Sequence, residues 1–430
     1  MSKIAVIGTG YVGLTTGACF AHLGHDVICA DIDEEKVARL QRGEIPILEQ
    51  GLDQLVHEGI ESGRLRFVLG AATAAAECEF AYLSVPTPQG ADGSADLSYI
   101  DAAAREIGPV LPPDAIVVNK STVPVGSTRV VDRALGRGDV FVVSNPEFLR
   151  EGSAVQDFLH PDRVVIGADD QRAAVRVASL YVGVPAPLMV TDPASAETIK
   201  YASNAFLATK LSFVNAVAAV CEGVGADVND VVLGMGYDKR ISSDFLRPGP
   251  GWGGSCFPKD SRALIRIAED AGYDFRLLKG VIEVNDEQFE RVAAKVVRMA
   301  GGGVDGVKVA VWGLTFKAGT DDRRDSPSLE VVSRLLEQGA VVRAYDPAVP
   351  SEHAADAADL EGIEVVDDPY AAVEGAEVLV VLTEWDELKW LDLDKVKDAM
   401  ATPRVLDGRN LLDRSALLRR GFTFEGIGRT

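Results

Sequence analysis

One cysteine of this 430-residue chain lies in an unusual setting. Cys256 stands in "GPGWGGSCFPKD", a stretch rich in glycine and proline that lets the backbone approach another group closely, with Lys259 and Asp260 directly behind it. The segment from "FPKD" onward predicts the start of a helix, and nearby cations and helix N-termini favour the thiolate form of a cysteine. Cys256 is therefore a candidate nucleophile, and Asp260 a candidate base or water-holding group. The other cysteines lie in or beside predicted helices and strands, where we expect structural roles: Cys19, Cys29, Cys78 and Cys221.

Two further pairs of polar residues have spacings that suit catalysis. Lys200 and Asn204 lie four residues apart in a long predicted helix, and a cation and an amide on one helical face suit an oxyanion clamp. Glu147 and Glu151 of "NPEFLREG" follow a predicted strand and share a face if the segment is helical, so they are candidates for acid–base work or for holding a water molecule. The structural alternatives are a lysine that extends along an apolar surface and a solvated helix start.

The N-terminal residues carry a glycine pattern typical of dinucleotide binding. In "GTGYVG", Gly8, Gly10 and Gly13 follow a predicted strand and open a helix, with Tyr11 and Val12 between the last two. The next strand ends at Asp31, which is placed to accept hydrogen bonds from the adenosine ribose and to repel a 2′-phosphate. Lys36 is positioned to reach the same ribose. The pattern therefore predicts NAD rather than NADP, and the alternative is a glycine turn in an α/β domain that binds no nucleotide.

Two threonines follow other predicted strands of the same domain. Thr87 lies in "SVPTP" and Thr122 in "NKSTVPVGS". Doubly wound sheets bind ligands beyond the carboxyl ends of their strands, so both hydroxyls are expected at the nucleotide crevice. Each could instead cap its own proline-rich turn.

The order of predicted elements indicates an α/β protein with a helical middle. Strands and helices alternate up to about residue 191, and a long helix then begins beside Asp192 and ends near Gly223 or Gly225. The alternation restarts after the glycines at 301–303. We expect two Rossmann-like doubly wound domains, at 1–191 and 301–430, joined by a central helical domain at 192–300. The long helix is expected to bridge domains or to pack against a second copy of the chain.

Composition limits the classes of partner and compartment. The formal net charge of −22 argues against a nucleic acid or an anionic membrane as the main partner. The N-terminus has no signal-peptide pattern, and apolar runs such as "VLVVL" are too short to span a bilayer. The cysteines form no close pair, which suits a reducing cytoplasm, and the histidines have no metal-ligand spacing, so no metal site is predicted.

Six motifs in series resemble those of one family, the UDP-glucose/GDP-mannose dehydrogenases. They are "GTGYVG", "STVPVGS", "NPEFLREG", "ETIKYASNAFLATKLSFVN", "GPGWGGSCFPKD" and "GLTFKAGTDDRRDSP", and they cover nearly the whole chain. "GEIPILEQGL" is similar to the branch that acts on UDP-glucose. The resemblance implies an NAD-dependent four-electron oxidation of UDP-glucose to UDP-glucuronate through a Cys256 thiohemiacetal and thioester. GDP-mannose and UDP-N-acetyl-hexosamine remain alternative substrates.

The resemblance also implies a role for each matched residue. Lys200 and Asn204 would stabilise the oxyanion, and Asp260 would act with Thr122 and Glu151 on the attacking water, while Glu147 would support Lys200 or that water. The NAD site would comprise Gly8, Gly10, Tyr11, Val12, Gly13, Asp31, Lys36, Thr87, Thr122, Glu151, Lys259 and Arg324. The substrate site would comprise Phe148, Leu149, Arg150, Glu151, Lys200, Asn204, Phe245, Leu246, Arg247, Pro248, Gly249, Gly253, Lys317 and Arg409, with Arg240 supplied by a neighbouring subunit.

Two positions depart from the family's pattern. Trp252 stands where relatives often have tyrosine or phenylalanine, and Pro86 replaces a frequent glycine near the expected NAD site. Independently of the family, Lys317, Arg323 and Arg324 form a basic group after a strand, which suits a pyrophosphate or is a solvated charge run.

Two other functions remain open at this point. One is a two-electron NAD dehydrogenase of a hydroxy acid, in which Cys256 is structural and one NADH forms per substrate. The other is a sensor that binds NAD or a nucleotide sugar without turnover, which the complete set of catalytic residue types disfavours.

Overall fold

A computed structural model describes residues 1–88, 90 and 95–429. The chain divides into two compact units, which we call the N-terminal unit (Met1–Ser203 with Arg262–Gly272) and the C-terminal unit (Asn204–Ser261 with Tyr273–Thr430).

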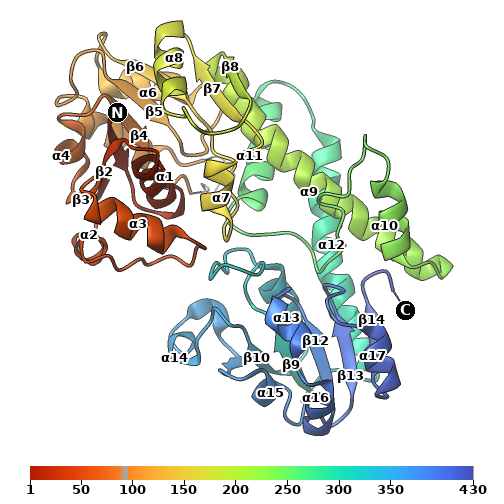
Figure 1. The fold of residues 1–430 in the computed structure, drawn as a ribbon. Coiled ribbons are helices and arrows are strands. Elements are labelled where there is room, and N and C mark those ends of the chain that lie inside the picture. Colours follow the sequence, from red (N-terminus) through yellow and green to blue (C-terminus); the bar gives the residue numbers. More distant parts are fainter. Residues whose placement is uncertain (89, 91–94, 430) are drawn as a thin grey trace. The chain divides into compact units, whose positions relative to one another are not determined.

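The N-terminal unit is built on one eight-stranded sheet with the order β3-β2-β1-β4-β5-β6-β7-β8 (Figure 1). In the described part of this sheet all neighbours are parallel except β6 and β7. Central strands such as β5, "IVVN", are buried along their whole length, as expected when helices cover both faces. The strands are β1 (Lys3–Ile7), β2 (Asp26–Asp31), β3 (Leu65–Leu69), β4 (Phe80–Leu83), β5 (Ile116–Asn119), β6 (Phe141–Ser144), β7 (Val164–Ala168) and β8 (Leu188–Thr191).

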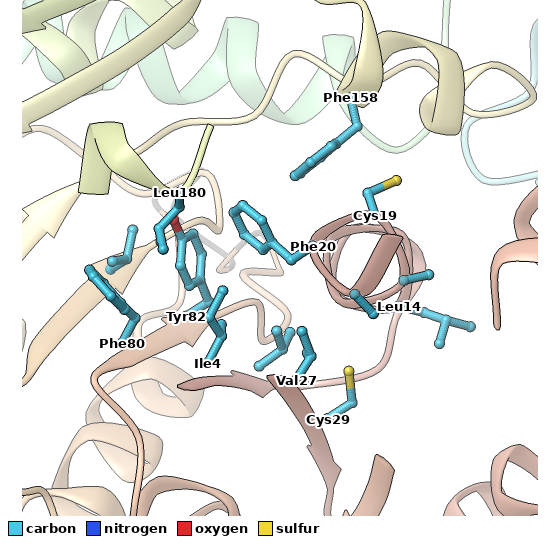
Figure 2. Packing of buried hydrophobic residues seen from close by; sticks show 14 of the residues in the cluster. Ile4, Leu14, Cys19, Phe20, Val27, Cys29, Phe80, Tyr82, Phe158 and Leu180 are labelled. Carbon is cyan, nitrogen blue, oxygen red and sulfur yellow. The ribbon is translucent and has the colours of Figure 1, made fainter. Parts of the chain in front are cut away.

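Two hydrophobic cores form on the two faces of this sheet. One contains residues of α1, α3, α7 and α8, and the other contains residues of α4, α5 and α6. Figure 2 shows Phe20 of α1 between Tyr82 of β4 and Phe158 of α7, with ring centroids 5.1 Å from each. The helices are α1 (Tyr11–His22), α2 (Glu34–Gln41), α3 (Leu52–Glu61), α4 (Ala71–Ala75), α5 (Ser98–Ile107), α6 (Ser127–Leu135), α7 (Ala154–Leu159) and α8 (Gln171–Ser179).

The long helix α9 (Pro193–Val224) begins in the N-terminal unit and continues in the C-terminal unit. Asp192 caps it by accepting from the Ser195 N–H at 2.8 Å, and Gly225 follows it at a φ of 76°, as the sequence predicted. An 18-residue window of α9 has a mean hydropathy of 1.4, so among the described residues it is the one helix long and apolar enough to cross a membrane. The expectation that all apolar runs are too short is therefore wrong for α9. Length and composition do not distinguish a membrane span from a core helix, and α9 has Glu197 and Lys200 on its buried side.

The C-terminal unit contains a six-stranded parallel sheet with the order β11-β10-β9-β12-β13-β14. This order repeats that of the first six strands of the N-terminal sheet, and the fold prediction of two doubly wound domains with a long intervening helix is confirmed. The strands are β9 (Lys308–Trp312), β10 (Val341–Tyr345), β11 (Ile363–Val365), β12 (Val378–Val381), β13 (Arg404–Asp407) and β14 (Thr423–Gly426). The helices are α10 (Val228–Gly236), α11 (Phe257–Asp270), α12 (Arg276–Met299), α13 (Pro327–Leu336), α14 (Ser351–Ala354), η1 (Ala358–Leu360), α15 (Pro369–Ala372), η2 (Asp386–Trp390), α16 (Leu393–Ala399) and α17 (Arg414–Arg419); α11 begins in this unit and continues in the N-terminal one.

Candidate active site

The glycine turn after β1 is shaped by close backbone contacts. Gly8 has a φ of 95°, and a Cβ atom on Gly13 would lie 1.9 Å from the Gly8 carbonyl oxygen, so side chains are excluded at both positions. A Cβ atom on Gly10 would meet nothing within 4 Å, so the space beside the first turn of α1 is open. Open space beside a helix N-terminus is what a pyrophosphate needs, and this turn therefore fits NAD.

Asp31 lies at the end of β2, beside this turn. Its Oδ2 accepts hydrogen bonds from the Thr9 N–H at 3.0 Å, the Thr9 hydroxyl at 2.5 Å and the Lys36 ammonium at 3.0 Å. Burial alone would raise the pKa of Asp31, but these bonds outweigh it and lower the pKa to about 2. The carboxylate is therefore ionised, as recognition of a ribose diol requires.

Tyr11 links the glycine turn to the start of α7. Its hydroxyl donates to Glu49 and accepts from the Gly152 N–H at 2.7 Å. Glu49 also accepts from the Ala154 N–H at 2.8 Å, in the first turn of α7. Glu49 was missed as an individual residue in the sequence, although its motif, "GEIPILEQGL", was noticed. The neighbouring Val12 is half-buried in α1.

The two threonines predicted at the nucleotide crevice are hydrogen-bonded to each other. The Thr87 hydroxyl donates to the Thr122 carbonyl oxygen at 2.9 Å. The loop after Thr122 is held by Glu197 of α9, which accepts from the Gly126 N–H at 2.6 Å and from the Thr128 hydroxyl at 2.6 Å. No local pattern in the sequence pointed to Glu197, because its partners lie 71 and 69 residues away along the chain.

Glu147 and Lys200 form a buried ion pair. The Lys200 Nζ donates to Glu147 Oε1 at 2.7 Å, and both side chains are at most 5% exposed. Burial raises the pKa of Glu147. This effect is outweighed by the charge and hydrogen bond of Lys200, the hydrogen bond from the Leu149 N–H and the charge of Lys120, so the pKa lies below its ordinary value. Glu147 and Glu151 would share a face only in a helix, and this segment is not helical. Residues 145–150 form a non-helical loop, and Glu151 lies in a turn before α7.

The rest of this loop has its own fixed contacts. The Phe148 ring lies 3.6 Å from the guanidinium carbon of Arg163 and 5.5 Å from the Lys200 Nζ. Arg150 forms a two-pronged ion pair with Asp157, at 2.6 and 3.0 Å. Arg163, which the sequence analysis did not identify, thus supports a loop predicted to contact substrate.

The glycines beside Cys256 admit close contacts within the C-terminal unit. A Cβ atom on Gly251 would lie 2.3 Å from the Phe289 ring, and one on Gly253 would lie 1.8 Å from the Asp325 carbonyl oxygen. A Cβ atom on Gly254 would lie 2.8 Å from a neighbouring phenylalanine ring. The cysteine loop is thus tightly packed, and this is why it is rich in glycine.

Amide and hydroxyl side chains of α9 and α12 also anchor the cysteine loop. Trp252 donates its indole N–H to Ser212 at 2.8 Å and exchanges two backbone hydrogen bonds with the Asn285 side chain. Gly249 donates its N–H to Asn215 at 2.9 Å and accepts from Gln288 at 2.8 Å. The sequence analysis did not single out these four polar residues. At Trp252, the departure from the family's pattern supplies an indole N–H that Ser212 accepts.

Cys256 and Asp260 lie at the start of α11. Cys256 is half-buried and its carbonyl oxygen accepts from the Asp260 N–H at 2.8 Å, which forms the first helical turn. The Asp260 side chain is fully buried, and it accepts from Lys259 and from Asn204, each at 2.6 Å. The C-terminal unit therefore brings together Cys256, Lys259, Asp260 and Asn204.

The remaining cysteines are all buried, and burial raises the pKa of Cys19, Cys29 and Cys78 to about 12. A buried thiol of high pKa is a poor nucleophile. Among the described residues Cys256 is the only cysteine that solvent reaches appreciably. No cluster of His, Cys, Asp and Glu able to hold a metal ion occurs in the described ranges.

Arg409 follows β13 and reaches two other strand ends of the C-terminal unit. Its Nε donates to the Leu382 carbonyl at 2.7 Å, its Nη2 donates to the Phe316 carbonyl at 3.0 Å, and Glu384 pairs with it at 3.0 Å. A Cβ atom on Gly249 would lie 3.2 Å from its Nη1, so Gly249 lies close to this arginine.

The other predicted substrate residues of this unit differ in their burial and in their contacts. Phe245 has a φ of 57°, Leu246 and Pro248 are buried, and Arg247 is exposed. Lys317 lies with its Nζ 5.5 Å from the Phe316 ring. Three exposed or half-buried arginines form ion pairs with nearby aspartates: Arg240 with Asp238, Arg323 with Asp359 and Arg324 with Asp322.

Comparison with known proteins assigns each part of the chain to one family. Residues 2–184 match its NAD binding domain, residues 194–287 its central domain and residues 310–414 its UDP binding domain. UDP-glucose 6-dehydrogenases of Rhizobium meliloti and Bacillus subtilis are 48% and 46% identical, covering 99% and 100% of this chain and 99% and 94% of their own lengths. A UDP-glucose dehydrogenase structure from Pyrobaculum islandicum superposes with a TM-score of 0.92 at 40% identity, covering 100% of this chain and 98% of that one. The chain therefore belongs to the UDP-glucose/GDP-mannose dehydrogenase family.

Proposed function

We propose that this chain catalyses the NAD-dependent four-electron oxidation of UDP-glucose to UDP-glucuronate. The observation that carries the proposal is the half-buried Cys256 at the start of α11, next to the hydrogen-bonded group of Asp260, Lys259 and Asn204. A simple two-electron dehydrogenase has no need for this arrangement. UDP-glucose is chosen as substrate because full-length relatives at 43–48% identity are UDP-glucose 6-dehydrogenases.

The reaction converts the C6 alcohol of the sugar to a carboxylate through two oxidations. NAD⁺ supplies the hydride acceptor for each of them. Between the oxidations, the Cys256 thiolate adds to the C6 aldehyde and forms a thiohemiacetal; its oxidation leaves a thioester, which water cleaves to release the carboxylate and the thiol. The balance is one UDP-glucose, two NAD⁺ and one water giving UDP-glucuronate, two NADH and three protons.

The polar residues then have distinct tasks. Lys200 and Asn204 donate hydrogen bonds to the oxyanion that develops on the sugar C6 oxygen. Asp260 works with Thr122 and Glu151 to hold and activate the attacking water. Glu147 keeps the Lys200 ammonium in place through their 2.7 Å ion pair.

Each ligand is assigned to its own set of residues. For NAD we propose the glycine turn with Tyr11 and Val12, Asp31, Lys36, Thr87, Thr122 and Glu151, with Lys259 and Arg324 at the phosphate or nicotinamide end. For UDP-glucose we propose the loops 148–151 and 245–249, Gly253, Lys317 and Arg409. The match of residues 310–414 to a UDP binding domain supports the second assignment.

The test is the number of NADH molecules formed per limiting UDP-glucose. We expect two from the wild type, and a stalled reaction from Cys256→Ser. Cys221→Ser, the same change at a buried cysteine, is the matched control and should retain turnover. One NADH per substrate, or an active Cys256→Ser variant, would overturn the thioester route. Turnover of GDP-mannose or a UDP-N-acetyl-hexosamine in place of UDP-glucose would change the substrate but keep the mechanism.

A second copy of the chain is the proposed partner of α9. Phe206, Phe213 and Val220 recur every seven residues along this helix, and their side chains are 65%, 53% and 62% exposed. An apolar row at this spacing on an exposed helical face suits association with another helix. The proposed assembly is a homodimer or a higher homo-oligomer, in which the exposed Arg240 would serve the neighbouring site.

The proposal also covers the domain boundaries and the cellular location. We keep the division into an NAD-binding domain at 1–191, a helical domain at 192–300 and a nucleotide-sugar domain at 301–430, which the boundaries of the three family matches support. We also propose a cytoplasmic location, which the wide spacing of the cysteines along the sequence supports.

A further inference from the structure

Lys120 is a buried lysine to which the mechanism above gives no role. It follows β5, and only 4% of the residue is exposed. Its Nζ lies 3.3 Å from the Asn145 side-chain oxygen and 3.4 Å from the Tyr181 hydroxyl, with the Phe158 ring 5.8 Å away. These partners are neutral, so Lys120 is a buried ammonium group with no directly bonded carboxylate among the described residues.

The charged groups that act on Lys120 belong to the candidate active site. The pKa of Lys120 is lowered to about 8, mainly by burial; the charge of Glu147 raises this pKa, and the charge of Lys200 lowers it. In turn the charge of Lys120 helps to lower the pKa of Glu147. Asn145 lies two residues before Glu147 in the same loop, so the Lys120 contacts and the ion pair share one segment of backbone.

We propose that Lys120 is a positioning residue whose buried positive charge keeps Glu147 ionised and thereby keeps Lys200 bound in place as a hydrogen-bond donor. The inference rests on the proposed function for its effect on turnover. Two ammonium groups then act on one buried carboxylate, Lys200 through a direct ion pair and Lys120 through its charge, and this positive charge disfavours a proton on Glu147. Without Lys120, only Lys200 and the Leu149 N–H oppose the effect of burial, which raises the pKa of Glu147.

The charge of Lys120 predicts an unusual dependence on pH. Below about pH 8 Lys120 is charged and supports Glu147, and above that pH it is neutral and the support is lost. A variant without the charge should therefore differ from the wild type below pH 8 and converge with it above. A purely structural lysine would change activity by a factor that does not depend on pH.

The experiment compares kcat for UDP-glucose from pH 4 to 10 in the wild type, Lys120→Met and Lys120→Gln. The glutamine keeps a donor for Asn145 and Tyr181 if the methionine variant does not fold. We expect the acidic limb of both variants to move up by about half to one pH unit, and their profiles to meet that of the wild type above pH 8. Tyr181→Phe removes a contact but no charge and should leave the shape of the profile unchanged. Variant profiles parallel to the wild type would overturn the inference.

A second measurement does not depend on turnover. The unfolded chain holds the Lys120 proton up to about pH 10.4, whereas the folded protein releases it near pH 8, so wild-type stability should rise relative to Lys120→Gln between these values. A stability difference that stays constant over this window would overturn the inference. If UDP-glucose were not a substrate, the proposed function would fail while this measurement still tested the buried charge.

Discussion

The side chain of Asn285 holds both backbone groups of Trp252. The Trp252 N–H donates to Asn285 Oδ1 at 2.8 Å, and Asn285 Nδ2 donates to the Trp252 carbonyl oxygen at 2.9 Å. Trp252 lies four residues before Cys256, and Asn285 lies in the middle of α12, 33 residues further along the chain. A buried amide thus fixes the loop that carries the proposed nucleophile.

Asn285→Ala should loosen this loop. It removes two hydrogen bonds and leaves a buried N–H and C=O unpaired, so we expect a loss of about 2–4 kcal/mol in the free energy of unfolding. Misplacement of Cys256 should also lower kcat by about tenfold to a hundredfold. Denaturant unfolding measures the loss of stability, and initial rates measure the loss of kcat. Asn229→Ala, at an exposed position of α10, is the control; equal losses in the two variants would argue against the anchoring role.

Gly253→Ala should disable the enzyme for a steric reason. The new methyl group would lie 1.8 Å from the Asp325 carbonyl oxygen, so the loop or its neighbour must shift. We expect a loss of about 1–3 kcal/mol in stability and an activity reduced at least tenfold. Gly280→Ala in α12 meets nothing within 4 Å and should stabilise the protein by about 0.5–1 kcal/mol with normal turnover. A fully active Gly253→Ala enzyme would contradict the packing of this loop.

The features that the sequence predicted are those with local causes. The capping of α9 by Asp192, the glycine turn before α1 and the start of α11 after Cys256 each depend on residues within one or two turns. Such patterns repeat across proteins because the backbone groups at helix ends need the same partners everywhere. The two doubly wound α/β domains followed from the alternation of strands and helices.

The features that it missed depend on contacts between distant residues. Glu147 looked like the start of a helix, but its partner Lys200 is 53 residues away and an adjacent backbone N–H occupies its other oxygen. In the sequence, Asn215 and Gln288 resemble ordinary polar residues of amphipathic helices. Only the structure shows that both bind the backbone of Gly249 in the cysteine loop. No local pattern distinguishes a solvated amide from one that holds a loop.

Asp31 should make stability depend on acidity. Its pKa is about 2 in the folded protein and about 3.9 in an unfolded chain, so its contribution is complete above about pH 5 and is lost as the pH falls towards 2. The stability difference between the wild type and Asp31→Asn should therefore be constant near neutral pH and shrink below about pH 5. Thermal unfolding between pH 7 and 3 measures it. Asp398→Asn, an exposed carboxylate of α16, is the control; an Asp31 difference that does not change with pH would disprove the linkage.

Phe213→Asp should separate the protomers of the proposed assembly. Phe213 is the middle residue of the exposed row on α9, and burying a carboxylate in an apolar helix contact is costly. Sedimentation velocity should show a smaller species than the wild type at the same concentration. Because Arg240 is proposed to act across the interface, turnover should fall with dissociation and recover partly as the protein concentration rises. Trp390→Asp places the same charge at an 83% exposed aromatic residue of η2 and should change neither size nor rate. A Phe213→Asp protein that sediments like the wild type would show that this row of α9 does not form the contact.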